Sequence, residues 1–431
     1  MSKQKQAIFI ILFLALASLM FPQQEVYITL KEGVPAISLA LPGFIPRSPT
    51  ASAREVAAEL YQVVSDDLSY SRIFSLLPKK YYDYIRPLDA NNIFFKDWES
   101  IQANILFVGE VSEGEGDSII FEGKLHDVKG ARFISGKRYQ APRNLSRLAA
   151  HRMADEIVKV LSGEKPIFTS KIVFVSDRDG NDELYMMDYD GQNQTRLTFN
   201  TIRDYTPAWS PDGKKIAYTS YKNLNAGLYI LDLEAGKVSP VSTRGTNYSP
   251  SYSPDGKRLA FCSTMDGNTE IYVAAADGKN IKRLTFNEAI DSSPSWSPTN
   301  REITFISDRS GLGQPQVYIM DAEGSNVRRV SFGGSYHDAP AWSPTGDRIV
   351  YVSRVENIFD LYVLNLRNNQ IVKLTESNAR NESPSWSSDG RHIVFTSNLG
   401  GLLQLYAIDY DGGNLRRLTS RGNNKLADWS N

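Results

Sequence analysis

From residue 171 to the end of the chain, short apolar runs alternate with short polar stretches. Runs such as KIAYTS (215–220) and RLAFCS (258–263) combine β-branched, aromatic and small residues over six positions. The stretches between them are rich in Gly, Pro, Asp and Asn, which favour tight turns. Runs of this length and composition are typical of buried strands, so the pattern predicts an all-β region.

These runs belong to a repeat. The string PAWSPDGKKIAYTS (207–220) recurs four times, as PSYSPDGKRLAFCS, PSWSPTNREITFIS, PAWSPTGDRIVYVS and PSWSSDGRHIVFTS. The aromatic residue of each copy, and of a final half-copy, stands at Trp209, Tyr252, Trp296, Trp342, Trp386 and Trp429, at intervals of 43 to 46 residues. A period of this length, with four short strands in each copy, indicates the blades of a β-propeller.

The ends of the repeat predict how many blades there are. The second-strand motif occurs six times and begins at KIVFVS (171–176), which has no first strand before it. The first-strand motif also occurs six times and ends at LADWS (426–430), which has no second strand after it. The last strand should therefore complete the first blade and close a ring of six. An open solenoid, the alternative, would leave two incomplete ends exposed.

The prolines that begin the first strands indicate which strand is innermost. Proline cannot donate to a strand ladder, so a strand that starts with it should have one free edge, here facing the central channel. The SPDG turns and turns such as DYDG (188–191) should then lie on one face of the ring. The loops that enter the first strands and leave the second strands should lie on the other face. These loops are the more varied and polar, so we expect the binding face there.

Residues 22–162 lack the repeat and mix strand and helix patterns. VYITL (26–30), AISLAL (36–41) and three later runs between 105 and 141 are predicted strands. Ser52 and Glu55 form an S-x-x-E capping box before a predicted helix, and a second helix is expected from a cap at Asn144 to Leu161. The sequence predicts a small α/β domain covered on one face, joined to the propeller (171–431) by a linker at 163–170.

The N-terminus has the pattern of an export signal. Lys3 and Lys5 precede an apolar run from Ala7 to Leu19, too short to span a bilayer as a helix. We expect a cleaved signal peptide at 1–21; an uncleaved anchor is the alternative. No Cys follows the run, so a lipid anchor is not expected, and the mature chain should not insert into a membrane. The only cysteine, Cys262, lies in an apolar run and cannot form an internal disulfide, so the bacterial periplasm is the compartment that fits best.

Composition and charge narrow the function classes. With 431 residues, 41% of them hydrophobic, the chain is long enough for two or three domains with cores of their own. The formal net charge is −1, which provides no overall field to hold nucleic acid.

The residues that could carry chemistry are scattered. There is no G-x-S-x-G motif, and none of the four histidines has a partner at metal-ligand spacing. Asp177, Asp179 and Asn181 resemble the start of a calcium loop, but the glycine is misplaced and similar turns recur in other blades. We therefore predict no catalytic site, no metal site and no cofactor.

The candidate binding residues stand just before the recurring proline of five blades and at the equivalent positions of the closing strand, which has Ala427 in its place. Three positions before it are Asp204, Asn247, Asp291, His337, Asn381 and Asn424, here called the first ring. Two positions before it are Tyr205, Tyr248, Ser292, Asp338, Glu382 and Lys425, the second ring. By symmetry the two rings should surround one mouth of the channel. One interpretation is a partly acidic funnel that accepts a segment of a partner. Others are side chains that only cap the loops, or a cation that bridges Asp204 and Asp291.

Taken together, the features resemble a known family. A signal peptide, an α/β domain and a six-bladed propeller with PxWSPDG repeats closed by a final WS strand are similar to the TolB family of the Tol-Pal system. Residues 91–111 and 147–178 also resemble that family's first domain and its junction with the propeller.

The resemblance implies a periplasmic, non-enzymatic and monomeric protein with two partners. It implies binding of the peptidoglycan-associated lipoprotein Pal at the propeller mouth, through the residues of the two rings. It also implies contact with TolA through the mature N-terminal segment, for which the candidate residues are Phe21, Pro22, Gln23, Gln24, Glu25 and Val26. The complex would support outer-membrane integrity and constriction at cell division.

One departure from the family pattern stands at the mouth. Family members carry a histidine where this chain has GTNYSP (245–250), and His337 supplies one at the same level of another blade. Two other functions stay open from the residues alone: a propeller enzyme or sugar-binding module of the same architecture, and a surface-exposed adhesion propeller.

Overall fold

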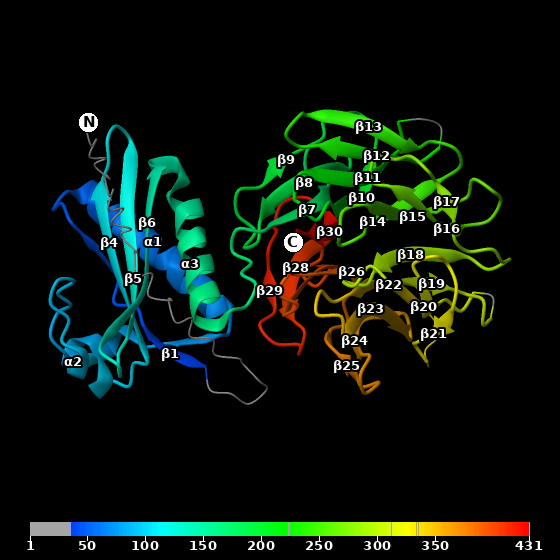
Figure 1. Ribbon diagram of the computed structural model, residues 1–431. Helices are drawn as coiled ribbons and strands as arrows, with labels where there is room; N and C mark the ends of the chain where they lie inside the picture. The colour runs from blue at the N-terminus through cyan, green and yellow to red at the C-terminus, as the bar shows by residue number, and fades with distance from the viewer. Residues whose placement is uncertain (1–35, 223–224, 312, 333, 335, 431) are drawn as a thin grey trace, which may run out of the picture.

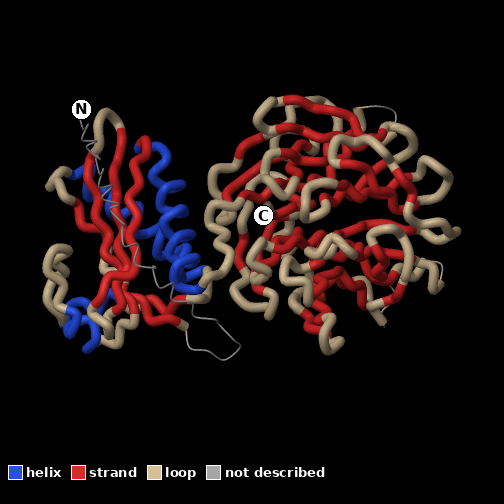
Figure 2. Tube along the Cα trace, viewed as in Figure 1, coloured by secondary structure: helices blue, strands red, loops and turns tan. Residues whose placement is uncertain are grey.

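A computed structural model describes residues 36–222, 225–311, 313–332, 334 and 336–430. It consists of a small α/β domain followed by a ring of six four-stranded sheets (Figure 1), which confirms the predicted fold class. Among the described residues, helices are confined to the first domain, and the ring is built of strands and loops (Figure 2). The predicted signal peptide and the predicted strand at 26–30 lie outside the described residues. No helix in the described ranges is both long and apolar enough to cross a membrane.

The first domain is a mixed sheet in the order β3-β1-β4-β5-β6, with β2 beside β4. Its strands are β1 (Ile37–Ala40), β2 (Phe44–Pro46), β3 (Phe74–Leu76), β4 (Ile105–Glu113), β5 (Ser118–Asp127) and β6 (Arg132–Pro142). Its helices are α1 (Ala51–Tyr70), α2 (Phe95–Ser100) and α3 (Ser146–Ser162), with 3-10 turns η1 (Lys79–Tyr84) and η2 (Arg143–Leu145). The three predicted strands between 105 and 141 correspond to β4, β5 and β6.

The first long helix begins two residues earlier than its capping box predicts. Thr50, not Ser52, is the N-cap: its side chain accepts a hydrogen bond from the amide of Ala53 at 3.1 Å. The side chain of Ser52 instead accepts a bond from Arg143, so it is not free to cap the helix. The apolar face, including Leu60 and Val64, is buried against the sheet as expected.

The second long helix also starts differently from the prediction. Asn144 lies in η2, and α3 begins at Ser146 after Leu145, with no side-chain cap bond. Its C-terminus follows the usual rule, because Gly163 adopts φ 69° and ends the helix. Ile157 and Leu161 are buried in the same core as α1.

The sheet of the first domain is covered on both faces, not on one as predicted. Phe107 of β4 points toward α1 and α3, whereas Leu106 and Val108 point the other way into a second, smaller core. Trp98 of α2, 3% exposed, and the loop around Tyr82 close this second core. The sequence pattern does not reveal this layer over the second face of the sheet, because α2 is only six residues long.

Each blade of the ring has four antiparallel strands. The innermost strands are β10 (Asp204–Trp209), β14 (Asn247–Tyr252), β18 (Asp291–Trp296), β22 (Tyr336–Trp342), β26 (Asn381–Trp386) and β30 (Asn424–Trp429). The second strands are β7 (Lys171–Ser176), β11 (Lys215–Ser220), β15 (Arg258–Ser263), β19 (Glu302–Ser307), β23 (Arg348–Val355) and β27 (His392–Ser397). The third strands are β8 (Glu183–Asp188), β12 (Gly227–Asp232), β16 (Glu270–Ala275), β20 (Gln316–Asp321), β24 (Ile358–Asn365) and β28 (Gln404–Asp409). The outermost strands are β9 (Thr195–Arg196), β13 (Lys237–Ser242), β17 (Lys282–Arg283), β21 (Arg328–Arg329), β25 (Ile371–Lys373) and β29 (Arg416–Arg417).

The ring closes as the two half-copies predict. Strand β30 pairs antiparallel with β7, with Trp429 opposite Ile172, so blade 1 is β30-β7-β8-β9 and blades 2 to 6 follow in chain order. The amide of Lys171 donates to the Ser430 hydroxyl at 2.8 Å, and the Ser430 amide donates back to the Lys171 carbonyl at 2.8 Å. The two ends of the propeller are therefore joined in one sheet.

The two domains share one hydrophobic core. Phe168 and Ile167 of the connecting segment pack with Tyr189 and Leu418 of the propeller and with Val64 of α1. All five side chains are at most 7% exposed. The first domain therefore rests on blades 1 and 6, on the side of the SPDG turns.

Candidate functional site

The mouth face is the face of the ring that carries the loops before β10, β14, β18, β22, β26 and β30. It lies opposite the side on which the first domain packs. At its centre is the channel, a cavity of about 420 Å³ lined by the innermost strands. Each innermost strand bends here through a bulge, where the residue before the proline (Leu426 in the closing strand, which lacks it) has φ between 44° and 55°. The bulge separates the two ring positions from the channel wall.

The first ring does not face the opening. Its six side chains are at most 2% exposed, so the prediction that they surround the mouth is wrong for this ring. Asp204 accepts a bond from Asn200 at 2.9 Å, and Asn381 donates to Asp360 at 3.2 Å. Their side chains fasten the loops to the blades beneath, because the loops fold over them.

His337 shows the consequence for the chemistry of the first ring. Its Nδ1 lies 2.7 Å from the Ser331 hydroxyl, and burial lowers its pKa to about 4. The imidazole is therefore neutral near pH 7 and is packed against Tyr351, with 5.0 Å between the ring centroids. It is not placed to replace the family's mouth histidine as a surface contact.

The alternative interpretation, a cation that bridges Asp204 and Asp291, is not favoured by the surroundings of Asp291. One oxygen of Asp291 accepts bonds from Arg309 at 2.7 Å and from Asn287 at 2.8 Å. The guanidinium already balances this charge. Within the part of the chain that the structure describes, no three His, Cys, Asp or Glu side chains come close enough together to hold a metal.

The second ring is half-exposed and lies at the opening. Tyr205 donates to Asp182 at 2.6 Å, and Lys425 pairs with the same carboxylate at 3.0 Å while lying 5.0 Å from the centre of the Tyr205 ring. Tyr248 continues this aromatic side of the mouth and donates to Thr269 at 3.4 Å.

The opposite side of the mouth is acidic. Asp338 accepts bonds from the hydroxyls of Tyr336 at 3.1 Å and Ser293 at 3.3 Å, and Glu382 pairs with Arg380. Among the described residues Asp338 has only neutral partners, so its charge is available to a cation that approaches from outside. The second ring thus offers a partner one aromatic and one acidic side.

The channel wall contains a single departure from small residues. Its equivalent positions are Ala208, Ser251, Ser295, Ala341, Ser385 and Asp428. The Asp428 carboxylate accepts the amide of Trp209 at 2.7 Å and the hydroxyl of Ser385 at 2.8 Å. It therefore links the closing strand to the blades on both sides, and burial raises its pKa to about 6.

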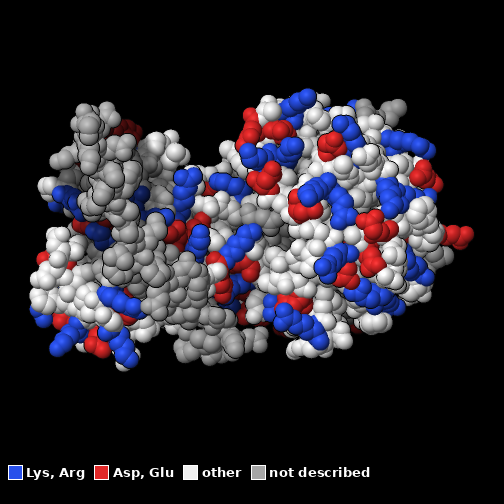
Figure 3. Space-filling view, in the orientation of Figure 1, with Lys and Arg blue, Asp and Glu red and all other residues white. Residues whose placement is uncertain are grey.

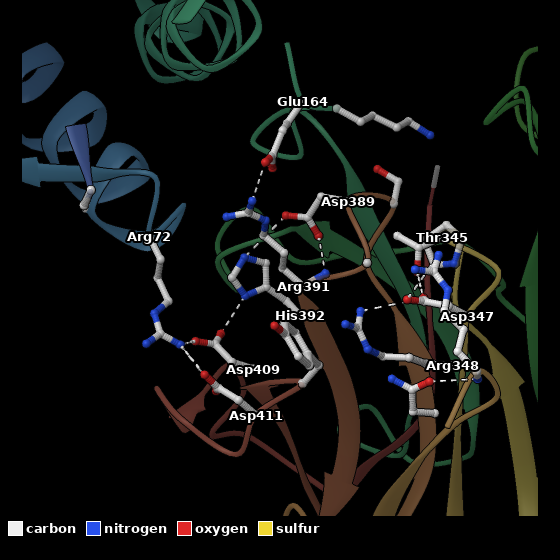
Figure 4. Close-up of a pocket in the computed structure, with 18 residues that line it drawn as sticks. Arg72, Glu164, Thr345, Asp347, Arg348, Asp389, Arg391, His392, Asp409 and Asp411 are labelled. Carbon is white, nitrogen blue, oxygen red and sulfur yellow. Dashed lines mark hydrogen bonds and ion pairs between the residues drawn. The ribbon is translucent and has the colours of Figure 1, made fainter. Parts of the chain in front are cut away.

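A second hollow lies between the two domains. This cleft has a volume of about 930 Å³ and is lined largely by charged side chains (Figure 4). Arg72 reaches from the first domain to Asp409 at 2.7 Å and Asp411 at 3.0 Å, and Arg391 pairs with Glu164. Ala36, the first described residue, lies at its edge.

The carboxylate of Asp409 interacts with side chains of both domains at the cleft. It accepts His392 Nδ1 at 2.8 Å as well as Arg72, and His392 is stacked on Tyr70 of α1 with centroids 4.1 Å apart. Burial alone would raise the pKa of Asp409, but the hydrogen bonds from His392 and Arg72 outweigh it and the net pKa is lowered. The cleft is therefore a self-neutralised ion-pair network.

The comparisons with known proteins match both domains. The family described as "TolB beta propeller domain" matches residues 158–361 and 337–431, and the "TolB amino-terminal domain" matches residues 26–133. The chain belongs to the TolB family. The fold and the order of domains agree with this assignment.

The relatives that match this chain are named TolB. Each match covers only part of the relative's length. "Protein TolB homolog" of Chlorobium chlorochromatii is 34% identical over 281 residues, which are 65% of this chain and 63% of the relative. "Tol-Pal system protein TolB" of Desulfosudis oleivorans is 33% identical over 215 residues, which are 49% of each chain. These matches span less than two thirds of the relatives' own length. The crystal structure of TolB from Acinetobacter baumannii covers 92% of this chain and 97% of its own, with 26% identity and a TM-score of 0.76.

The predicted site residues of this TolB-family chain differ in where the structure places them. Tyr205, Tyr248, Asp338 and Glu382 come together at the mouth, whereas the N-terminal candidates 21–26 lie outside the described residues. Asp428 was missed, although the repeat itself marks it as the one carboxylate at a small-residue position. The cleft was also missed, and no local signal could have found it, because its residues are brought together from positions as distant as 72 and 409.

Proposed function

We propose that this chain is the periplasmic protein-interaction component of a Tol-Pal system. It binds a Pal-like peptidoglycan-associated lipoprotein at the mouth face and a TolA-like, inner-membrane-anchored protein through its N-terminal segment. In this role it supports outer-membrane integrity and the constriction of the envelope at division. It acts by binding, without a cofactor and as a monomer.

The observation that carries the proposal is the second ring in a TolB-family propeller. On the face left open by the first domain, half-exposed aromatic and acidic side chains lie at the end of the channel, and one of them, Asp338, lines its cavity of about 420 Å³. Aromatic side chains are enriched at protein interfaces, and charges at an interface contribute to specificity and orientation. On the face seen in Figure 3, both signs of charge are interspersed, so the sequence and this view favour a localised partner site over long-range attraction to a polyanion.

The N-terminal half of the proposal is supported by the place where the described chain begins. Ala36 lies at the edge of the charged cleft between the domains, on the opposite side from the mouth face. A segment that leaves from this point can reach a second partner while the mouth is occupied. The two partners therefore need not compete for the same surface.

The test is affinity capture from a detergent-solubilised envelope extract with the mature protein as bait. We expect Asp338→Lys and Glu382→Lys to weaken retention of the Pal lipoprotein at least about tenfold, because reversed charge repels the cation that each carboxylate would meet. Retention of the TolA-like protein should stay unchanged, since it does not depend on the mouth.

The matched control is Asp277→Lys, a charge reversal in an exposed turn on the opposite face. Reversal at the buried Asp204 or Asp291 is not a binding test, because it would unfold the loops. Wild-type retention of the lipoprotein by both mouth variants, or no retention by the wild type, would contradict the mouth assignment. Turnover or tight binding of a sugar by the purified protein would favour the enzyme or sugar-binding alternative.

A further inference from the structure

Three of the six blades present a highly exposed phenylalanine at the same position on the mouth face. The residues Phe199, Phe286 and Phe332 are 76%, 73% and 69% exposed to solvent. Each follows the outermost strand of its blade, β9, β17 or β21, and opens the loop that leads to the next innermost strand. Each also stands five residues before a first-ring residue in the same loop.

The loop does not need the phenylalanine in order to fold. In blade 1, Arg196 Nε donates to the Thr198 carbonyl at 2.7 Å, and the Thr198 hydroxyl accepts a strand amide at 2.9 Å. Blade 6 makes the same two bonds with Arg417 and Thr419, at 2.6 and 2.9 Å. There the next residue is Ser420, which is exposed. Since blade 6 builds the same start of the loop with a serine, the exposed aromatic ring is not explained by folding.

The other blades confirm that this position tolerates polar residues. Thr243 in blade 2 and Glu376 in blade 5 are also exposed there. An exposed aromatic ring contributes little to stability, whereas at an interface it supplies large apolar area. The three rings are therefore apolar side chains placed where the fold would accept polar ones.

Each ring is held in position before any partner arrives. The guanidinium of the preceding arginine lies 4.8 to 5.1 Å from the ring centre in all three blades. Arg196 and Arg283 are themselves anchored by the buried carboxylates of Glu183 at 3.0 Å and Glu270 at 2.6 Å. One face of each ring is thus occupied and the other is turned to solvent. A side chain held in this way loses little freedom on binding, which favours an anchor role.

We propose that Phe199, Phe286 and Phe332 are the apolar anchors by which the mouth face holds its lipoprotein partner. This inference rests on the proposed function and extends it outward from the second ring to blades 1, 3 and 4. The partner is a folded domain that offers apolar sockets around the segment that meets the acidic and aromatic sides of the mouth. Blades 2, 5 and 6 contribute polar contacts at the same radius.

The experiment measures the affinity of the purified globular domain of the same bacterium's Pal lipoprotein for the mature protein by titration calorimetry. The variants are Phe199→Ser, Phe286→Ser, Phe332→Ser and the triple variant, which copy the residue found naturally in blade 6. We expect at least about tenfold weaker binding for each single variant and a larger loss for the triple variant, with unchanged thermal unfolding.

The matched controls are Ile281→Ala and Val327→Ala. These exposed side chains flank the outermost strands of blades 3 and 4, but on the opposite face, and are 39% and 37% exposed. They should leave the affinity unchanged, which separates loss of a contact from loss of exposed apolar surface in general.

The outcomes separate the two proposals. If the phenylalanine variants bind as tightly as the wild type while Asp338→Lys binds weakly, the anchors are refuted and the mouth assignment stands. If the wild type does not bind the lipoprotein domain, both proposals fail together. An equal loss in the Ile281 and Val327 controls would also overturn the anchor assignment.

Discussion

At the scale of single residues, burial decides which polar side chains can take part in recognition. Asp204 and Tyr205 are neighbours in sequence, yet the first is fully buried and the second is half-exposed. Successive side chains of a strand point to opposite sides, and the loop covers the side on which Asp204 lies; the bulge follows only after Tyr205. A buried carboxylate such as Asp204 stabilises its loop, whereas Tyr205 and Asp338 remain available to a partner.

Asp428 provides a prediction at this scale. Its folded-state pKa of about 6 lies above the ordinary aspartate value, so the folded protein holds this proton more tightly between about pH 4 and pH 6. Protonation therefore favours folding, and the contribution, roughly 3 kcal/mol at most, is lost as the pH rises through about 6. We expect the free energy of unfolding of the wild type, measured with urea relative to that of Asp428→Ser, to be larger at about pH 4.5 than at about pH 7.

Asp428→Ser is a conservative reference, because serine occupies three of the equivalent channel positions and can accept the Trp209 amide. Subtracting its unfolding curve removes the pH response of all other groups. A difference that does not change with pH, or that grows toward neutral pH, would contradict the raised pKa.

At the scale of elements, the closing strand is the one on which the ring depends most. β30 is the innermost strand of blade 1, and its Trp429 donates to the Ser170 hydroxyl at 2.8 Å while packing in the core shared by both domains. The other tryptophans of the propeller lie in clusters between neighbouring blades: Trp209, Trp296, Trp342 and Trp386.

We expect Trp429→Ala to lower the free energy of unfolding by about 3–5 kcal/mol, since it leaves a cavity at the seam and removes this bond. Trp429→Phe should cost less, because it keeps most of the apolar volume. Urea unfolding monitored by circular dichroism measures both. A loss below about 1 kcal/mol for the alanine variant would show that Trp429 contributes little to the stability of the closed ring.

At the scale of the whole molecule, the two domains are joined by an apolar core and bordered by a charged cleft. Phe168, 2% exposed, lies where the linker passes between them, and Tyr189 of the propeller donates to the buried Asp67 of α1 at 2.5 Å. Asp67 also lies 2.7 Å from Nδ1 of His151 on α3. The ion pairs of Arg72 are half-exposed and contribute less.

This arrangement predicts a single calorimetric unfolding transition for the wild type. Phe168→Ala removes the central apolar contact and should split the transition into two, one for each domain, with a loss of about 3–5 kcal/mol. Arg72→Ala should keep one transition and cost at most about 1 kcal/mol. Two transitions in the wild type, or one in Phe168→Ala, would refute the shared core as the coupling element.

The sequence by itself determined the number of blades, the closure by the last strand and the innermost position of the proline strand. Those features follow from local, periodic patterns: strand length, turn residues and the spacing of Trp209 to Trp429. It also singled out the residues of the second ring, because they stand two positions before the proline in five blades and at the equivalent position of the closing strand.

Only the tertiary structure decided which ring is exposed, how the first domain is covered on both faces and that it is docked on blades 1 and 6. These features depend on loops that fold over polar side chains and on contacts between residues hundreds of positions apart, such as Arg72 and Asp409. The three exposed phenylalanines required both the sequence pattern and the tertiary structure to be recognised. Their repeat position is visible in the sequence, but only their exposure beside a serine-bearing equivalent loop marks them as binding residues. The physical reason is that pattern fixes which elements form, whereas burial is a property of how those elements pack.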